Sequence, residues 1–196
     1  MKLVVATKNA HKIHELSEML AIDGLTLVSL ADVGFTGEIE ENGATFAENA
    51  LIKARAAAKF CGLPALADDS GLCVDALDGE PGIYSARYAS ADGENASDAA
   101  NVEKLLEKLK GIPSGERTAR FVCAIALVLP DGSEKTVTGA CEGVITSEVR
   151  GNGGFGYDPV FYYVPYCKTF GEATEDEKNA VSHRANAVRL IKQQLL

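Results

Sequence analysis

Residues 67–72 of this 196-residue chain read Ala67-Asp68-Asp69-Ser70-Gly71-Leu72. An apolar run leads into the two aspartates, and a second apolar run follows the glycine. Two adjacent carboxylates followed by Ser-Gly predict a strand end that opens into a tight turn. Acidic side chains beside buried residues are usually paired or bound to a metal. The stretch is therefore either a carboxylate site for a hard cation such as Mg²⁺ or an Asx-type turn with solvated carboxylates.

The composition is that of a soluble globular protein, with 46% hydrophobic and 24% charged residues. We expect one domain over residues 1–196, because this length can bury a full core. No apolar run approaches the roughly 20 residues of a membrane span, and the N-terminal apolar run is too short for a signal peptide. Five scattered cysteines without a C-x-x-C pair predict free thiols in the reducing cytoplasm. The net charge of −9 argues against binding a nucleic-acid polymer.

A polar loop lies between a predicted strand over residues 3–6 and a predicted helix over residues 10–21. The residues of this loop and of the first helical turn are Thr7, Lys8, Asn9, Ala10, His11 and Lys12. The first N–H groups of a helix have no partners within the helix, and two lysines add positive charge, so the loop suits a phosphate. The alternative is a polar N-cap with two surface lysines.

The next predicted elements are a strand over residues 25–30 and a helix over residues 46–60. Thr45 and Glu48 form a capping-box pattern at the start of this helix. Glu41 lies just ahead of it, in a loop that also carries Glu38 and Glu40. Taken alone, Glu41 reads as a solvated acid in a flexible loop.

The middle of the chain predicts a further helix over residues 97–110 and then a group of strands. Asp131-Gly132 between two apolar runs predicts a hairpin of strands over residues 118–129 and 133–140. A third strand is expected over residues 143–149.

Residues 151–156 formally match G-x-G-x-x-G, but the segment that follows is strand-like and not helical, which excludes a dinucleotide loop. The glycines instead let the backbone pass close to another group. Phe155 and Tyr157 offer π faces and Asp158 offers an acceptor, a combination that suits a flat heteroaromatic base. The alternative is a glycine-rich turn whose aromatic residues pack in the core.

The C-terminal segment carries a second capping-box pattern at Thr174 and Glu177. Ser182 can cap a final helix that has His183 and Arg184 in its first turn. Cations at a helix N-terminus oppose the helix dipole, so a ligand with acceptor groups would explain them. The alternative is that both are ordinary surface residues.

Five motifs occur in one order along the chain. They are Thr7-x-Asn9-x-x-Lys12, Glu41 ahead of Thr45-Phe46-x-Glu48-Asn49-Ala50, Ala67-Asp68-Asp69-Ser70-Gly71-Leu72, Phe155-Gly156-Tyr157-Asp158-Pro159-Val160-Phe161, and Glu177-Lys178-Asn179 with Ser182-His183-Arg184. Over essentially its whole length the chain resembles the inosine/xanthosine triphosphate pyrophosphatase family. The resemblance implies an α/β fold: an elongated two-lobed domain with a long central mixed β-sheet flanked by helices and the active site in the cleft. It also implies a homodimer.

The implied reaction is Mg²⁺-dependent hydrolysis of ITP, dITP and XTP to the nucleoside monophosphate and pyrophosphate. Asp69 resembles the family's proton acceptor, and Glu41 and Asp69 would hold the metal, with Asp68 or Glu40 as further candidate ligands. The substrate-binding residues implied are Thr7, Lys8, Asn9, Ala10, His11, Lys12, Ser70, Phe155, Gly156, Tyr157, Asp158, Lys178, His183 and Arg184. Arg184 and His183 would donate to the C6 oxygen of hypoxanthine or xanthine, and adenine would leave these donors unpaired.

Two other functions are compatible with the same residues. One is a related pyrophosphatase that prefers modified pyrimidine or other nucleotides, and the other is a non-catalytic nucleotide-binding module. A non-catalytic module would not require the two carboxylates of Glu41 and Asp69.

Overall fold

The computed structural model describes residues 1–195, which form two compact units. Unit 1 contains residues 1–69, 123–139 and 184–195. Unit 2 contains residues 70–122 and 140–183. The chain thus passes between the units four times, directly after Asp69, Val122, Gly139 and His183.

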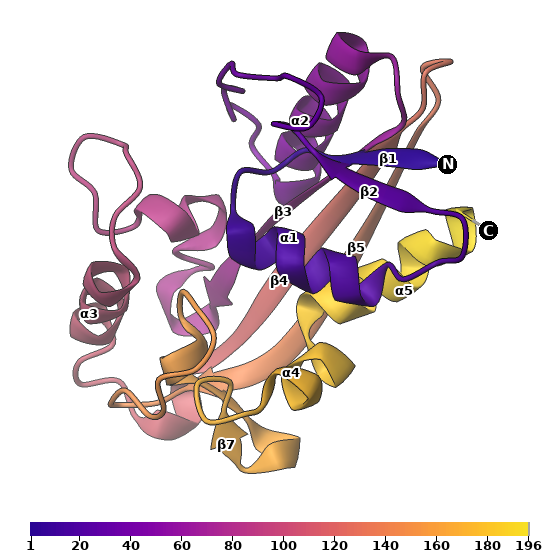
Figure 1. Cartoon of the computed structure of the whole chain (residues 1–196). Helices are drawn as coiled ribbons and strands as arrows, with labels where there is room; N and C mark the ends of the chain where they lie inside the picture. The colour runs from indigo at the N-terminus through magenta and orange to yellow at the C-terminus, as the bar shows by residue number, and fades with distance from the viewer. Residues whose placement is uncertain (196) are drawn as a thin grey trace. The chain divides into compact units, whose positions relative to one another are not determined.

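In the described part of the chain, seven strands form one mixed sheet in the order β2-β1-β3-β4-β5-β6-β7 (Figure 1). The strands are β1 Lys2–Val5, β2 Thr26–Ser29, β3 Ala65–Val74, β4 Thr118–Val128, β5 Glu134–Ile145, β6 Phe161–Tyr163 and β7 Lys168–Thr169. β1 runs parallel to β2 and β3, whereas β6 runs antiparallel to β5 and β7. The expected mixed sheet flanked by helices is confirmed.

Within residues 1–195, five α-helices complete the fold, and their ends follow from local sequence. They are α1 Ala10–Met19, α2 Phe46–Cys61, α3 Asp98–Lys108, α4 Glu175–Val181 and α5 His183–Leu195. The side chains of Asn9, Thr45, Ser97 and Thr174 each accept a backbone hydrogen bond at the start of the helix that follows. Gly62 ends α2 at a φ of 66°, a conformation that glycine adopts without strain. None of the helices within residues 1–195 combines the length and apolarity needed to cross a membrane.

The core of unit 1 has two layers, one on each face of its strands. Ala65 and Ala67 of β3 pack with the alanines of α2, whereas Leu66 packs with α1 and α5. Successive side chains of a strand point to opposite faces, and the pattern along β3 follows this rule. The alternation continues into the two aspartates that end the unit 1 part of β3.

Unit 2 has its own aromatic core. The rings of Phe121, Phe161 and Phe170 lie in mutual contact, with centroids 4.5 to 6.2 Å apart. Leu105 and Leu109 of α3 belong to the same buried cluster. Together these side chains support the start of β4 and the segment that leads into β6.

Two predictions of local structure were wrong. β3 runs without interruption through Asp68-Asp69-Ser70-Gly71 to Val74, and the chain turns only afterwards. β3 is hydrogen-bonded to β4 in the sheet, and strand pairing of this kind outweighs the local preference of Asp-Ser-Gly for a turn. The third strand expected over residues 143–149 is the end of β5, which continues to Ile145. Position 143 lies inside this strand and is a glycine, because a Cβ there would come within 2.5 Å of the Phe161 ring.

Candidate active site

Asp69 lies on the α2 face of β3, where a lysine joins it to a second carboxylate. Lys53 Nζ is 3.1 Å from Asp69 Oδ1 and 2.8 Å from Glu41 Oε2. Asn49, one helical turn before Lys53, donates from Nδ2 to Asp69 Oδ2 over 3.2 Å. Asp69 is therefore held through both of its carboxylate oxygens, and Glu41 and Asp69 both lie within hydrogen-bond distance of one cationic nitrogen.

The loop that carries Glu41 is fixed to the start of α2 by Gly43. The N–H of Gly43 donates to Asn49 Oδ1 over 2.8 Å. A Cβ at Gly43 would lie 2.7 Å from both Asn49 Oδ1 and Glu48 Cβ, so only glycine permits this approach. Glu48 turns back to accept from the N–H of Ala44, one residue before the expected partner in a capping box. Asn49 thus links the Glu41 loop to Asp69.

The electrostatics of this cluster favour a bound cation. Burial lowers the pKa of Lys53, but the charges of Asp69, Asp68 and Glu41 outweigh burial and raise the pKa above its ordinary value. Burial, together with the charge of Glu41, raises the pKa of Asp69 despite the nearby lysines. Lys53 is therefore an ammonium ion between two carboxylates at neutral pH. Because carboxylate oxygens are the ligands that Mg²⁺ prefers, Glu41 and Asp69 suit that metal.

Asp68 points to the other face of β3, where it is fully buried. Its Oδ2 accepts from Lys12 Nζ and from Arg184 Nη2, each over 3.0 Å. Arg184 Nη1 in turn donates to Glu15, so the cluster joins α1, β3 and α5. Burial alone would raise the pKa of Asp68, but Lys12, Arg184 and Lys53 hold it well below its usual range. Asp68 therefore faces away from the Glu41–Lys53–Asp69 group, which argues against it as a shared metal ligand.

The predicted phosphate loop is also the N-cap of α1. Asn9 Oδ1 accepts from the N–H of Lys12, and Thr7 Oγ1 accepts from the N–H of Asn9, each over 3.2 Å. The Asn9 bond confirms the N-cap part of the alternative, but Lys12 is not a surface lysine, because its ammonium pairs with the buried Asp68. Lys8 and His11 are exposed and Ala10 begins the helix, while the Lys12 side chain retains 14% exposure. Phosphate binding by this loop stays a prediction.

The glycine-rich segment of unit 2 folds around Asp158. Asp158 Oδ2 accepts from Lys178 Nζ over 2.7 Å and from the N–H of Phe155 over 2.9 Å. Lys178 Nζ also lies 4.5 Å from the centroid of the Phe155 ring. A Cβ at Gly154 would come within 2.1 Å of Asp158 Oδ2, so the group that this backbone approaches is the chain's own carboxylate. Gly156 donates from its N–H to Asp98 over 2.6 Å.

The other predicted base-binding residues are more buried than expected. Tyr157 is 4% exposed and donates from its hydroxyl to the carbonyl of Ser85 over 2.8 Å, whereas Phe155 is half-buried. His183 is buried with its ring stacked on Phe121 at a centroid distance of 4.8 Å. Of the two predicted π faces, that of Tyr157 therefore belongs to the unit 2 core, as the alternative interpretation expected.

Ser70 and Arg184 also have defined places. Ser70 is half-buried within β3, directly after Asp69. The Arg184 side chain is 1% exposed, and two of its nitrogens contact carboxylates. Donation from Arg184 to a purine stays a prediction, and such a ligand would compete with Asp68 and Glu15.

Sequence reasoning missed the roles of Asn49, Lys53 and Glu15. Asn49 and Lys53 lie one turn apart on α2, beside the buried alanines of that helix. A lysine and an asparagine next to an apolar stripe are unusual, and that was the available signal. Glu15 offered a similar signal, because it precedes Leu16 in the buried part of α1.

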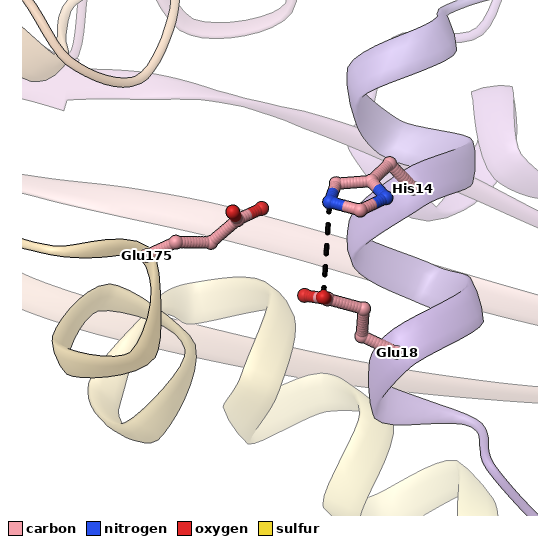
Figure 2. A group of neighbouring side chains, drawn as sticks. All are labelled: His14, Glu18 and Glu175. Atoms are coloured by element: carbon pink, nitrogen blue, oxygen red, sulfur yellow. Dashed lines mark ion pairs between the residues drawn. The ribbon is translucent and has the colours of Figure 1, made fainter.

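A histidine and a glutamate one turn apart on α1 form an exposed pair on the surface of the helix. His14 Nε2 lies 3.8 Å from Glu18 Oε1, and both side chains are exposed (Figure 2). Exposed pairs of this kind contribute little to stability. The pair is a feature of the helix surface.

Comparison with known proteins gives matches over nearly the whole chain. The sequence profile of the Ham1 family matches residues 3–194. A protein of Desulforamulus reducens named dITP/XTP pyrophosphatase is 54% identical over 190 residues, which cover 96% of this chain and 92% of that protein. A Bacillus subtilis protein of the same name is 52% identical over 188 residues, covering 96% and 93%.

Solved structures agree with these matches. The Ham1 protein of Staphylococcus aureus has a TM-score of 0.89 and 42% identity, with 100% of this chain and 98% of that chain covered. A HAM1 protein from Coxiella burnetii has a TM-score of 0.90 and 43% identity, with the same coverage. The extent of these matches, at identities well above 30%, leads to one conclusion: this chain belongs to the Ham1 family.

Proposed function

We propose that this chain hydrolyses the deaminated purine nucleotides dITP, ITP and XTP between the α and β phosphates, with Mg²⁺, to give the monophosphate and pyrophosphate. Membership of the Ham1 family, with full-length relatives named dITP/XTP pyrophosphatase, makes the chain a hydrolase of nucleoside triphosphates. The identity of the bases and of the metal is the proposal. Its cellular role is to remove damaged nucleotides from the precursor pool.

One observation carries the proposal for the metal: the Lys53 ammonium contacts the carboxylates of both Glu41 and Asp69. A cation already stabilises this pair of oxygen donors, and Mg²⁺ prefers such donors. When bound, Mg²⁺ would neutralise phosphate charge and make a coordinated water more acidic. Asp69 would accept the proton of the attacking water. Burial raises the pKa of Asp69 in the metal-free protein, and in the loaded site its effect as a base would come from its position beside the coordinated water.

The phosphates would bind to the N-terminal loop of unit 1. Lys8 and Lys12 supply positive charge, and the start of α1 adds the partial positive charge of a helix N-terminus. Thr7, Asn9, Ala10 and His11 complete this predicted set, and Ser70 follows the proposed base Asp69 in the chain. Local positive charge of this kind offsets the overall negative charge of the protein.

The purine would bind to the predicted set of Phe155, Gly156, Tyr157, Asp158, Lys178, His183 and Arg184. Phe155 is the half-buried aromatic residue of the glycine-rich segment, so it is our candidate for stacking on the base. Asp158 and Lys178 support it, because both contact the Phe155 residue. Gly156 and Tyr157 would fix the conformation of this segment through their hydrogen bonds to Asp98 and Ser85. His183, with Arg184 next to it in the chain, remains our candidate donor to the C6 oxygen.

The remaining assignments are a cytoplasmic location and a homodimer that binds neither nucleic-acid polymers nor membranes. The net charge of −9 supports a small-molecule substrate over a nucleic acid. The five cysteines are free thiols, which supports a reducing compartment. Light scattering of the purified protein tests the dimer, and a monomer at micromolar concentration would exclude it.

A panel of nucleotides with Mg²⁺ tests the function. We expect ITP, dITP and XTP to release pyrophosphate, with little turnover of ATP or GTP, and no activity in EDTA. Release of orthophosphate would exclude cleavage between the α and β phosphates. Preference for a pyrimidine nucleotide would support the related pyrophosphatase, and tight binding without turnover would support the non-catalytic module.

A further inference from the structure

We propose that Asp68 is a positioning residue that holds the Lys12 ammonium in place for the phosphates of the substrate; this rests on the proposed function. The inference starts from the alternation along β3. Asp69 faces Lys53 on one side of the strand, and Asp68 faces Lys12 and Arg184 on the other. The two neighbouring carboxylates therefore serve two different groups of cations.

Asp68 is suited to fix a lysine. Its side chain is fully buried in the interior of β3, between β1 and β4 in the sheet. Lys12 is the third residue of α1, and its ammonium lies 3.0 Å from Asp68 Oδ2. The side chain of Lys12 keeps 14% exposure, whereas that of Asp68 has none, so Lys12 is the member of this pair that solvent reaches. A free lysine loses rotamer freedom when it binds phosphate, and Asp68 imposes much of that order beforehand.

Because Arg184 also contacts Asp68, the Asp68 carboxylate stays paired with a cation when Lys12 binds a phosphate. Arg184 Nη2 contacts the same Oδ2 atom at 3.0 Å, and Glu15 contacts the other end of the guanidinium. An ammonium has three N–H donors, so Lys12 can keep Asp68 and still donate to a phosphate. Asp68 stays ionised throughout, since Arg184 remains beside it. The four side chains form two pairs of opposite charge, which explains how Glu15, Asp68 and Arg184 can be buried.

Asp68→Asn tests this inference with Glu15→Gln as its matched control. Both variants remove one buried carboxylate partner of Arg184, but only Asp68→Asn removes the partner of Lys12. The probe is inorganic tripolyphosphate, which has no base, measured by isothermal titration calorimetry. We expect Asp68→Asn to weaken binding about tenfold and to raise KM for ITP more than it lowers kcat. We expect Glu15→Gln to stay within about twofold of the wild-type protein.

A double-mutant cycle shows whether Asp68 acts through Lys12. Lys12→Met should weaken tripolyphosphate binding about as much as Asp68→Asn, and the double variant should be no weaker than either. Equal losses in Asp68→Asn and Glu15→Gln would overturn the inference, as would fully additive losses in the double variant. Circular dichroism and thermal unfolding establish that each variant is folded.

A measurement on the wild-type protein covers the case in which Asp68→Asn does not fold. Nitrogen-15 NMR detects lysine ammonium groups that are held in ion pairs, and Lys12→Met assigns the signal. We expect a resolved Lys12 signal in the free protein and a shift on addition of tripolyphosphate. A missing signal, or one that tripolyphosphate leaves unchanged, would contradict the inference. Absence of ITP turnover in the wild-type protein would instead refute the proposed function.

Discussion

Replacing Lys53 by methionine should make the stability of this protein depend on a divalent cation. The substitution keeps most of the side-chain length but removes the ammonium between Glu41 and Asp69. Loss of one partner from a buried ion pair costs about 3–5 kcal/mol. The Lys53 side chain is 9% exposed, but Glu41 is 34% exposed, so water stabilises part of the uncovered charge. We therefore expect a loss of about 3 kcal/mol in the free energy of unfolding, or roughly 6–12 °C in Tm.

Thermal unfolding in EDTA and in saturating MgCl₂ measures this effect. If Glu41 and Asp69 bind Mg²⁺, the metal should restore about 2–3 kcal/mol to Lys53→Met, as expected for a ligand at about 100 times its Kd. The gain should be smaller in the wild-type protein, where the ammonium already stabilises both carboxylates.

Arg55→Met is the control for this experiment. Arg55 lies on the same helix, and its exposed pair with Glu134 contributes less than about 1 kcal/mol. The control should gain from Mg²⁺ as the wild-type protein does. Equal gains in Lys53→Met and the wild-type protein would refute the assignment of Glu41 and Asp69 as a cation site.

Two further predictions concern other parts of the molecule. Gly154→Ala should lower the free energy of unfolding by about 2 kcal/mol more than Gly156→Ala. Both glycines have positive φ, but only at Gly154 would a Cβ meet Asp158. Chemical denaturation measures the free energy of unfolding of each variant, and equal losses would exclude the steric explanation. Iodoacetamide at about pH 8 should label the exposed Cys167 before Cys123, because burial raises the pKa of the Cys123 thiol to about 12. Peptide mass spectrometry measures the order of labelling, and early labelling of Cys123 would contradict its burial.

Regular local patterns in the sequence were sufficient to predict three of the helices and one hairpin, whereas the mixed sheet was expected only from the family resemblance. The helices α1, α2 and α3 lie where apolar spacing and capping residues place them, within one or two residues at most ends. The Asp131-Gly132 hairpin is present, with Gly132 at a φ of 84°. These features depend on interactions between residues close in the chain, which a single sequence displays directly.

The errors arose where distant parts of the chain decide local structure. Asp68-Asp69-Ser70-Gly71 has the composition of a turn, yet β-strand partners hold it extended within β3. Gly143 resembles a strand boundary, but it is needed there because the Phe161 ring packs against its backbone. The strand that pairs with residues 68–71 and the ring that packs on Gly143 are both distant in the sequence, so local preference predicted the wrong structure.

The same limit applies to the candidate site. Sequence motifs singled out Glu41 and Asp69, but not the lysine that joins them, because Lys53 is recognised only once α2 lies beside β3. In the sequence, Asp68 and Asp69 also read as one acidic pair. The extended backbone of β3 separates the two side chains to opposite faces, and this assigns them to different cations.

The most direct test of the central claim is the kcat for ITP hydrolysis by Asp69→Asn, compared with Asp68→Asn under saturating ITP and Mg²⁺. A base at Asp69 predicts a fall of about 10²–10⁴-fold for Asp69→Asn, while Asp68→Asn keeps most of its kcat. Full activity of Asp69→Asn would contradict the account, and so would an equal loss of kcat in both variants.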